Sequence, residues 1–259
     1  MDLTLPRRVD AEALDNLPAQ DPRALRARRD LHRVHRAMGT RSTLLQALRR
    51  LSVRRTITAA SAPLRVLELG AGDGSLMLGV AQAMHSRWPA VALTLLDRQA
   101  LLAPATAAAY TACGWTATQQ LCDVRDWAAE GDLPAAPSPA LQIPHWDLVV
   151  ANLFLHHFEH LELAAVLAAV ARRTDDFFAC EPRRGWLAWA GSHLVGALGA
   201  NAVTRADAVL SVHAGFRAAE LRALWPASAR GWTLSEYPAG LFSHCLLASR
   251  ARGTPDGGV

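Results

Sequence analysis

Apolar runs alternate with amphipathic stretches through the middle of the chain. Four short runs are strongly apolar and a fifth is weaker, and stretches of 13 to 15 residues with helical periodicity separate several of them. Strands that are buried on both faces of a parallel sheet have this pattern, with crossover helices between them. The sequence therefore predicts an α/β protein with a doubly wound, mainly parallel sheet. The expected strands are Leu64–Leu69, Val91–Leu96, Trp115–Leu121, Trp146–Phe154 and Asp176–Cys180, and the expected helices are Ser75–Arg87, Gln99–Cys113 and His160–Arg172.

The pattern changes after the fifth expected strand. Residues 183–230 are mostly helical by pattern and form an insertion before the last two strands. Those strands, Gly231–Tyr237 and Leu241–Ser249, are expected to form an antiparallel hairpin joined by Pro238-Ala239-Gly240, because proline and glycine favour turns. The proline-rich residues 130–145 are expected to be a surface loop, and residues 250–259 a flexible tail.

Two helices are expected before the first strand. Residues 1–20 lack a regular pattern, whereas Asp21 followed by Pro22 is a good helix start. We expect a helix over Pro22–Met38 that Gly39 ends, and a second over Ser42–Ser52. Residues 1–60 would then form a helical cap on a ligand-binding domain that spans residues 61–249.

The charge is concentrated in this cap. All 27 Lys and Arg positions are arginine. Residues 1–60 contain thirteen arginines and six acidic residues, which gives a net charge of +7, and the rest of the chain has a net charge of −3. A solvated helix face explains such a segment, and an acidic partner or anionic ligand is the alternative.

The longest Ala/Leu-rich stretch, Leu161–Ala171, is too short to span a bilayer, and the first 20 residues lack an apolar signal core. We therefore expect a cytoplasmic protein without a membrane span. The four cysteines form no C-x-x-C pair, so we expect no structural zinc.

The most informative segment joins the first expected strand to a helix. It reads Glu68-Leu69-Gly70-Ala71-Gly72-Asp73-Gly74. Glycines allow a tight turn and the close approach of a ligand at the carboxyl end of a strand. The G-x-G-x-G spacing differs from the G-x-G-x-x-G of dinucleotide folds. Its acidic neighbours would repel a pyrophosphate but not a ligand that carries ammonium and sulfonium groups.

Four segments together resemble class I methyltransferases that use S-adenosylmethionine (SAM). The glycine segment is similar to their first motif, and Asp97 to the acid that ends their second strand. Cys122-Asp123-Val124 matches the segment after the third strand. Trp146–Asn152, followed by Leu155-His156-His157, matches the fourth-strand motif. The match covers residues 64–182 in the family's order, and the family also ends its sheet with an antiparallel hairpin.

The resemblance implies SAM as the cofactor and assigns its contacts. Gly70 and Gly72 would line the methionine part, Asp97 would hold the ribose, and Asp123 and Val124 would hold the adenine. Asn152 would close the site near the methyl group. Arg98 stands where the family often has an apolar residue. The implied cofactor-binding residues are Glu68, Gly70, Gly72, Asp73, Gly74, Asp97, Arg98, Asp123, Val124 and Asn152.

The acceptor end of the site is less defined by the sequence. Abstraction of a proton from a phenol or enol suits histidine, and we expect His157, or else His156, to act as the base or to orient the substrate. The alternative is that both only shape the pocket. Residues 183–230 contain aromatic and apolar residues suited to a planar or lipophilic acceptor, with Arg205 and His213 as expected contacts. No metal site is expected, because the His156–His160 spacing matches no zinc signature.

We therefore expect a methyltransferase acting on an oxygen or carbon of a small aromatic, polyketide-like or quinol-like acceptor. The Arg-rich entry helix and the insertion resemble methyltransferases of bacterial polyketide or quinone pathways. Methylation of RNA or protein is an alternative that only the basic cap supports. In the family, Asn-Pro-Pro-Tyr marks enzymes that methylate amino groups of nucleobases. Because Asn152 is not followed by Pro-Pro-Tyr, we do not expect a nucleic-acid partner. A nicotinamide oxidoreductase or a non-catalytic SAM-binding module also stays open. The Arg-rich helical cap could also be a homodimer surface.

Overall fold

The computed structural model describes residues 5–54, 62–84, 88–130 and 144–251. The expected surface loop lies almost wholly outside these residues, as do the end of the first crossover helix and nearly all of the expected tail. Among the described residues, no helix combines the length and the apolar character that crossing a membrane requires.

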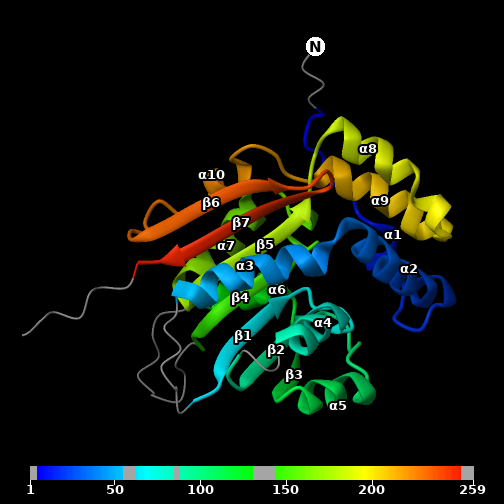
Figure 1. The fold of residues 1–259 in the computed structure, drawn as a ribbon. Coiled ribbons are helices and arrows are strands. Elements are labelled where there is room, and N and C mark those ends of the chain that lie inside the picture. The colour runs from blue at the N-terminus through cyan, green and yellow to red at the C-terminus, as the bar shows by residue number, and fades with distance from the viewer. Residues whose placement is uncertain (1–4, 55–61, 85–87, 131–143, 252–259) are drawn as a thin grey trace, which may run out of the picture.

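A seven-stranded sheet in the order β3-β2-β1-β4-β5-β7-β6 forms the centre of the molecule (Figure 1). Strands β1 to β5 are parallel, and β7 runs antiparallel between β5 and β6. The order reverses between β1 and β4, which creates the crevice where open α/β sheets bind ligands. The strands are β1 (Leu64–Leu69), β2 (Val91–Asp97), β3 (Trp115–Leu121), β4 (Trp146–Asn152), β5 (Thr174–Pro182), β6 (Trp232–Ala239) and β7 (Ser243–Arg250).

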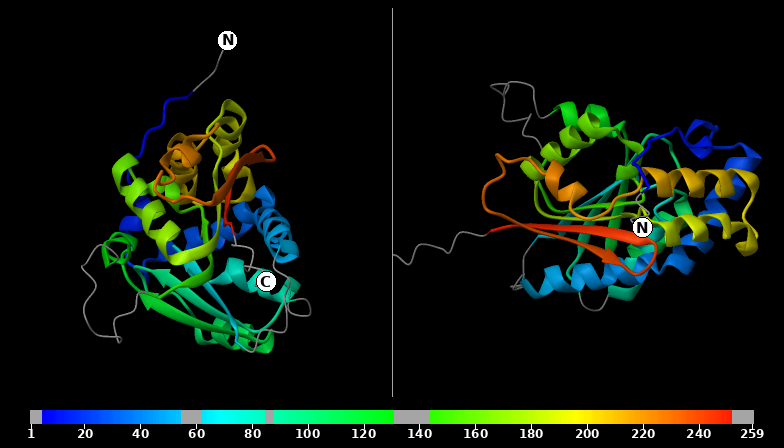
Figure 2. Two further views of the ribbon diagram at one scale, coloured as in Figure 1. Left: turned by 90° about the vertical axis from the view of Figure 1, so that its left-hand side faces the viewer. Right: turned by 90° about the horizontal axis from the view of Figure 1, so that it is seen from above.

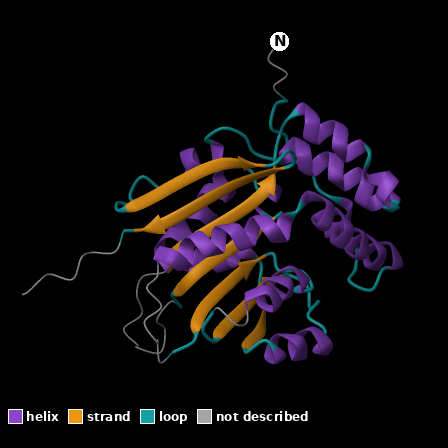
Figure 3. Cartoon of the chain, in the orientation of Figure 1, coloured by secondary structure: helices purple, strands orange, loops and turns teal. Residues whose placement is uncertain are grey.

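Helices cover both faces of the sheet, as Figures 1 and 3 show. Because strand side chains alternate, Leu67 contributes to the core on one face while its neighbour Val66 contributes to the other. The helices α6 (Val124–Ala129), α7 (His160–Arg173) and α10 (Glu220–Leu224) pack on the Leu67 face. The helices α3 (Thr40–Arg54), α4 (Ser75–Met84) and α5 (Pro104–Ala112) cover the Val66 face. The predicted doubly wound fold is confirmed.

A further group of helices lies at the carboxyl ends of the parallel strands (Figures 1 and 2). Its members are α1 (Ala13–Asn16), α2 (Pro22–Met38), the 3-10 helix η3 (Leu155–His157), α8 (Trp186–His193), the 3-10 helix η4 (Val195–Leu198) and α9 (Ala202–Ala214). The predicted bounds of α2 are confirmed. Asp21 caps its first turn by accepting the Arg23 N–H at 2.8 Å, and Gly39 ends it at φ +69°.

The structure corrects three local expectations. The hairpin turn is Gly240–Phe242 and not Pro238–Gly240, because β6 continues to Ala239. Pro238 is tolerated there since β6 is the edge strand of the sheet. The helix expected from Gln99 begins at Pro104, because a proline disfavours the helical conformation of the residue before it, and Ala103 is extended (φ −75°, ψ 147°). The N-terminal segment, expected to be irregular, contains α1.

Candidate active site

A cavity of about 880 Å³ lies at the carboxyl ends of β1, β2 and β4. Its size is near the upper end of small-molecule sites, about 300–1,000 Å³. The N-terminal segment, α2, α8 and α9 form the opposite wall, so the cavity lies between the sheet and the extra helices. Of the expected cofactor contacts, all but Gly74 line it: Glu68, Gly70, Gly72, Asp73, Asp97, Arg98, Asp123, Val124 and Asn152.

The glycine segment adopts a backbone that other residues would strain. Gly70 and Gly72 have φ of +65° and +56°, in the left-handed region. A Cβ on Gly70 would lie 2.1 Å from the Phe154 ring, so this position also lacks space for a side chain. Gly74 has a structural role instead. Its carbonyl accepts a hydrogen bond from Tyr110 at 2.5 Å, and it is absent from the cavity lining.

Two buried acceptor atoms at this end of the cavity have no partner among the described residues. They are Oε2 of Glu68 and Oδ1 of Asn152. Burial raises the pKa of the Glu68 carboxyl well above its usual range, and the negative charges of Asp73 and Asp97 add to the effect. An unpaired buried polar atom is costly. A ligand that brings donors or positive charge would remove that cost at both atoms.

Asp97 and Asp73 hold the glycine loop in place. Asp97 accepts the N–H of Gly72 and of Gln99, each at 2.9 Å, and its oxygens keep further acceptor capacity towards the cavity. Asp73 contacts His32 of α2 at 3.0 Å and accepts the Ser75 N–H. Burial would raise the pKa of Asp73, but these hydrogen bonds outweigh it and hold the pKa at about 2.

The residues that the resemblance assigns to the adenine side, together with Arg98, all line the cavity. Asp123 caps α6 by accepting the Arg125 N–H at 2.8 Å, and Val124 is buried beside it. Arg98 donates to the Asp15 carbonyl at 3.1 Å, which joins the end of β2 to the N-terminal segment. Their contacts to a nucleoside stay a prediction.

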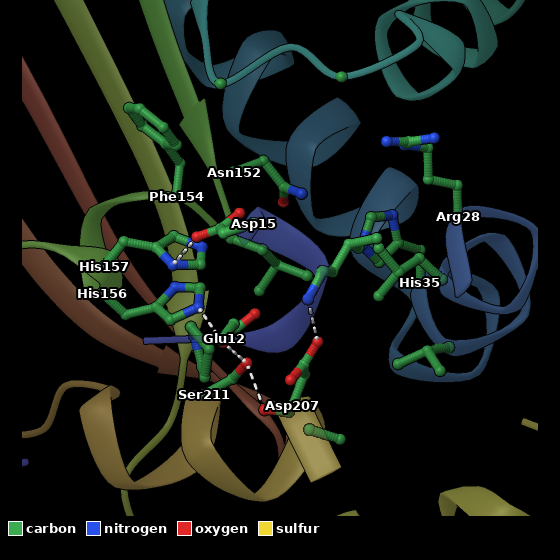
Figure 4. A pocket seen from close by; sticks show the side chains of 18 of the residues that line it. Glu12, Asp15, Arg28, His35, Asn152, Phe154, His156, His157, Asp207 and Ser211 are labelled. Atoms are coloured by element: carbon green, nitrogen blue, oxygen red, sulfur yellow. Dashed lines mark hydrogen bonds and ion pairs between the residues drawn. The ribbon is translucent and has the colours of Figure 1, made fainter. Parts of the chain in front are cut away.

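The two histidines follow β4 and differ in their surroundings (Figure 4). His156 is buried between two carboxylates: its Nδ1 lies 2.8 Å from Glu181 and its Nε2 lies 3.3 Å from Glu12. Glu181 also accepts the backbone N–H groups of Phe154, Leu155 and His156. Burial would lower the pKa of His156, but the hydrogen bonds to Glu12 and Glu181 override it and raise the pKa to about 9. His156 is therefore a cation at neutral pH.

His157 is the more accessible of the two. Its Nδ1 lies 3.2 Å from an oxygen of Asp15, and its ring centroid is 4.2 Å from that of His156. Burial would raise the pKa of Asp15, but the hydrogen bond and charge of His157 and the charge of Arg98 lower it. Asp15 is therefore a carboxylate that can orient the His157 ring, an arrangement found in acid–base catalysis.

Sequence reasoning missed the residues that the N-terminal segment supplies. Glu12 and Asp15 lie beside the two histidines, and α9 holds the segment: Asp207 accepts the N–H of Ala13 at 2.8 Å, and Ser211 donates to Glu12. The spacing of Glu12 and Asp15, one helical turn apart, was the available signal. Nothing in it identifies histidines more than 140 positions away.

The two expected acceptor contacts stay a prediction, and the cavity lining does not support them. Arg205 and His213 are absent from the cavity lining. Arg205 is exposed and lies against Gly196. The helix α9 does line the cavity, but through another face, because residues spaced by three and four positions share one side of a helix. The lining residues of α9 are Thr204, Asp207, Ala208, Ser211 and Val212.

Three side chains near η3 and the N-terminal segment could also approach a metal ion. Ligand atoms of Glu12, His156 and His157 lie within 4.8 Å of one another. A metal at His156 would have to displace the proton that Glu12 and Glu181 stabilise there. The arrangement therefore favours a charged hydrogen-bonded cluster, and the expected absence of a metal stays a prediction.

No protein-family model matches the chain, and a search of curated proteins finds no match. Solved structures do match. The apo form of the S-adenosylmethionine-dependent methyltransferase SibL aligns with a TM-score of 0.53 and 15% identity, over 96% of this chain and 64% of that one. Magnesium protoporphyrin IX methyltransferase (ChlM) from Synechocystis PCC 6803 with bound SAM aligns with a TM-score of 0.47 and 15% identity, over 92% and 88%. LepI in complex with SAM aligns with a TM-score of 0.45 and 13% identity, over 75% and 45%.

The chain thus spans less than half of LepI and just under two thirds of SibL. Its five parallel strands and terminal antiparallel pair form the sheet that the sequence predicts, and the match to SibL supports the same fold. The protein therefore has the Rossmann-like fold of class I SAM-dependent methyltransferases.

Proposed function

We propose that the protein is an enzyme that transfers a methyl group from SAM to an oxygen or carbon of a small aromatic, polyketide-like or quinol-like acceptor. One observation carries the proposal. A single cavity joins a left-handed glycine turn, flanked by two buried acceptor atoms without partners, to a histidine–carboxylate pair. The fold shared with SibL, which is a SAM-dependent methyltransferase, supports the same function.

The chemistry of the donor set fits SAM. Gly72 leaves open space beside the backbone for a ligand, and the unpartnered oxygens of Glu68 and Asn152 suit its ammonium and sulfonium groups. Asp97 would accept the ribose hydroxyls. Asp123 and Val124 would hold the adenine. SAM supplies a methyl group that its sulfonium already activates, so the protein needs chiefly to align the acceptor and exclude water.

The acceptor would lie between η3 and α9. Apolar side chains such as Leu14, Phe154 and Val212 line this part of the cavity and suit a planar or lipophilic molecule. His157, oriented by Asp15, would accept the proton of an acceptor hydroxyl through its free nitrogen. His156 cannot share this task at neutral pH because its two carboxylates hold it protonated. It would instead anchor Glu12 and keep the N-terminal segment over the site.

A methyl-transfer assay with SAM and a panel of phenols and quinols tests the proposal. His157→Ala should leave SAM affinity nearly unchanged and lower turnover roughly 100-fold or more. His160→Ala, at an exposed position three residues along the chain, is the matched control and should keep full activity. If His157→Ala keeps its turnover, His157 is not the base and only shapes the pocket. SAM binding without transfer to any acceptor would favour the non-catalytic module.

We further propose that the enzyme acts in the cytoplasm on a small molecule and not on nucleic acid. The arginines of the cap support this view, since Arg28 is the only one of those described that lines the cavity. The homodimer also stays a prediction, and light scattering in solution would test it.

A further inference from the structure

A set of large apolar side chains is exposed on α8 and η4. Leu194 is 69% exposed and Trp186 is 54% exposed, and three neighbours on the same segment are exposed as well. The opposite side of the segment packs inward through Ala188 and Val195. The exposed set is Trp186, Leu187, Trp189, Leu194 and Leu198. Five such side chains on one short segment are unusual for a face in contact with water alone.

A stripe of arginines borders this apolar set. Arg26, Arg29, Arg33 and Arg36 recur at three and four positions on the exposed side of α2. Arg33 joins the two features, because it donates to the Leu198 carbonyl at 3.0 Å. Figure 1 shows α2, η4 and α8 at the same end of the molecule. We call the five apolar residues and the four arginines the basic–apolar face.

Negative charge is scarce on this face. Residues 186–199 contain no Asp or Glu, and Asp30, the only acidic residue of α2, is buried. Arg205 adds a further cation beside Gly196 of η4. The excess of basic residues in the cap therefore appears on the surface as one arginine stripe next to exposed tryptophan and leucine.

The basic–apolar face also borders the cavity. Leu194 and Leu198 both line the cavity and remain exposed, and Ala37 of α2 does the same from the other side. Part of the cavity lining therefore reaches the surface between η4 and α2, within the face itself.

We propose that the basic–apolar face docks on the surface of an anionic phospholipid bilayer. Tryptophan side chains favour the headgroup level, leucines favour the acyl boundary, and arginines bind anionic lipid headgroups. These three chemistries occur together here. Since part of the cavity lining reaches the surface within this face, docking would place that part against the bilayer, a route for a lipophilic acceptor that rests on the proposed function.

Two other occupants fit the face less well. A symmetric second copy would bring two arginine stripes together, because a two-fold interface pairs the same surface patch with itself. RNA would neutralise the arginines but would leave Leu187 and Leu194 without a partner, since bases stack on aromatic side chains and not on leucine.

Flotation of the full chain with lipid vesicles, without SAM, tests the proposal separately from methyl transfer. The vesicles are pure phosphatidylcholine or an equimolar mixture of phosphatidylcholine and phosphatidylglycerol. We expect binding to the anionic vesicles at least tenfold tighter than to the neutral ones, and weakened by 0.5 M salt. Trp186→Ser/Trp189→Ser and Arg26→Gln/Arg29→Gln/Arg36→Gln should each weaken that binding at least tenfold. None of these five residues lines the cavity.

Matched controls lie elsewhere on the surface. Leu161→Ser on α7 removes a leucine that is 82% exposed, and Arg222→Gln/Arg230→Gln removes two exposed arginines near α10. Both controls should bind anionic vesicles like the parent protein. Absence of binding by the parent, or equal losses in the controls, would overturn the proposal. So would a dimer that Trp186→Ser/Trp189→Ser dissociates, or tighter binding to single-stranded RNA that only the arginine variant loses.

Discussion

The charged cluster at His156 should make stability depend on pH. His156 is buried between Glu12 and Glu181, and its pKa is about 9 in the folded protein against about 6.5 in the unfolded chain. A group whose pKa is raised by folding stabilises the protein fully below its unfolded pKa, and this contribution is lost as the pH rises through the folded value. The interval from 6.5 to 9 corresponds to about 3 kcal/mol of unfolding free energy.

Urea unfolding from pH 6 to pH 9.5 measures this effect. The parent protein should lose about 3 kcal/mol over the window relative to His156→Gln, which keeps a donor for Glu181 but carries no titrating charge. Subtracting the variant removes other groups, among them His32, whose pKa the Asp73 hydrogen bond raises. The control His160→Gln should follow the parent. Parallel curves for the parent and His156→Gln would refute the reasoning, because His156 would then not titrate with folding.

Two further predictions concern the cofactor end of the cavity. Gly70→Ala should cost about 1–2 kcal/mol for the left-handed backbone and more for displacing the Phe154 ring; in a Phe154→Ala background only the backbone cost should remain. Urea unfolding of the four proteins measures this difference, and equal costs in both backgrounds would contradict it. Asp97→Ala should weaken SAM binding by on the order of 1–3 kcal/mol, measured by calorimetry. Unchanged affinity would mean that Asp97 does not hold the ribose.

The parts of the fold with strong local signals were predictable. The bounds of β1 and β3 agree with the sequence prediction, because Gly70 follows β1 and Gly114 precedes β3. The end of α2 was predictable because Gly39 adopts a left-handed backbone. Glycines after β1 and the acid after β2 likewise identified one end of the cavity.

The other end depends on contacts between distant segments. Glu12 reaches His156 across 144 positions, and no local pattern encodes that contact. Contacts between distant segments also decide which face of α9 lines the cavity. Arg205 and His213 looked suited to a ligand by residue type, but packing against the N-terminal segment turns Asp207 and Ser211 towards the cavity. Residue type alone does not identify the side of this helix that lines the cavity, because only tertiary structure decides which face is turned inward.

Thermal unfolding with SAM, S-adenosylhomocysteine, NADH and NADPH in parallel tests the central claim most directly. A ligand at 100 times its Kd adds about 2.7 kcal/mol to stability, which is roughly 5–10 °C for a chain of this size. The account predicts a shift of this order with the two adenosyl ligands alone, and a smaller shift for Asp97→Ala at the same concentration. A shift with the nicotinamides alone, or with none of the four ligands, would contradict it.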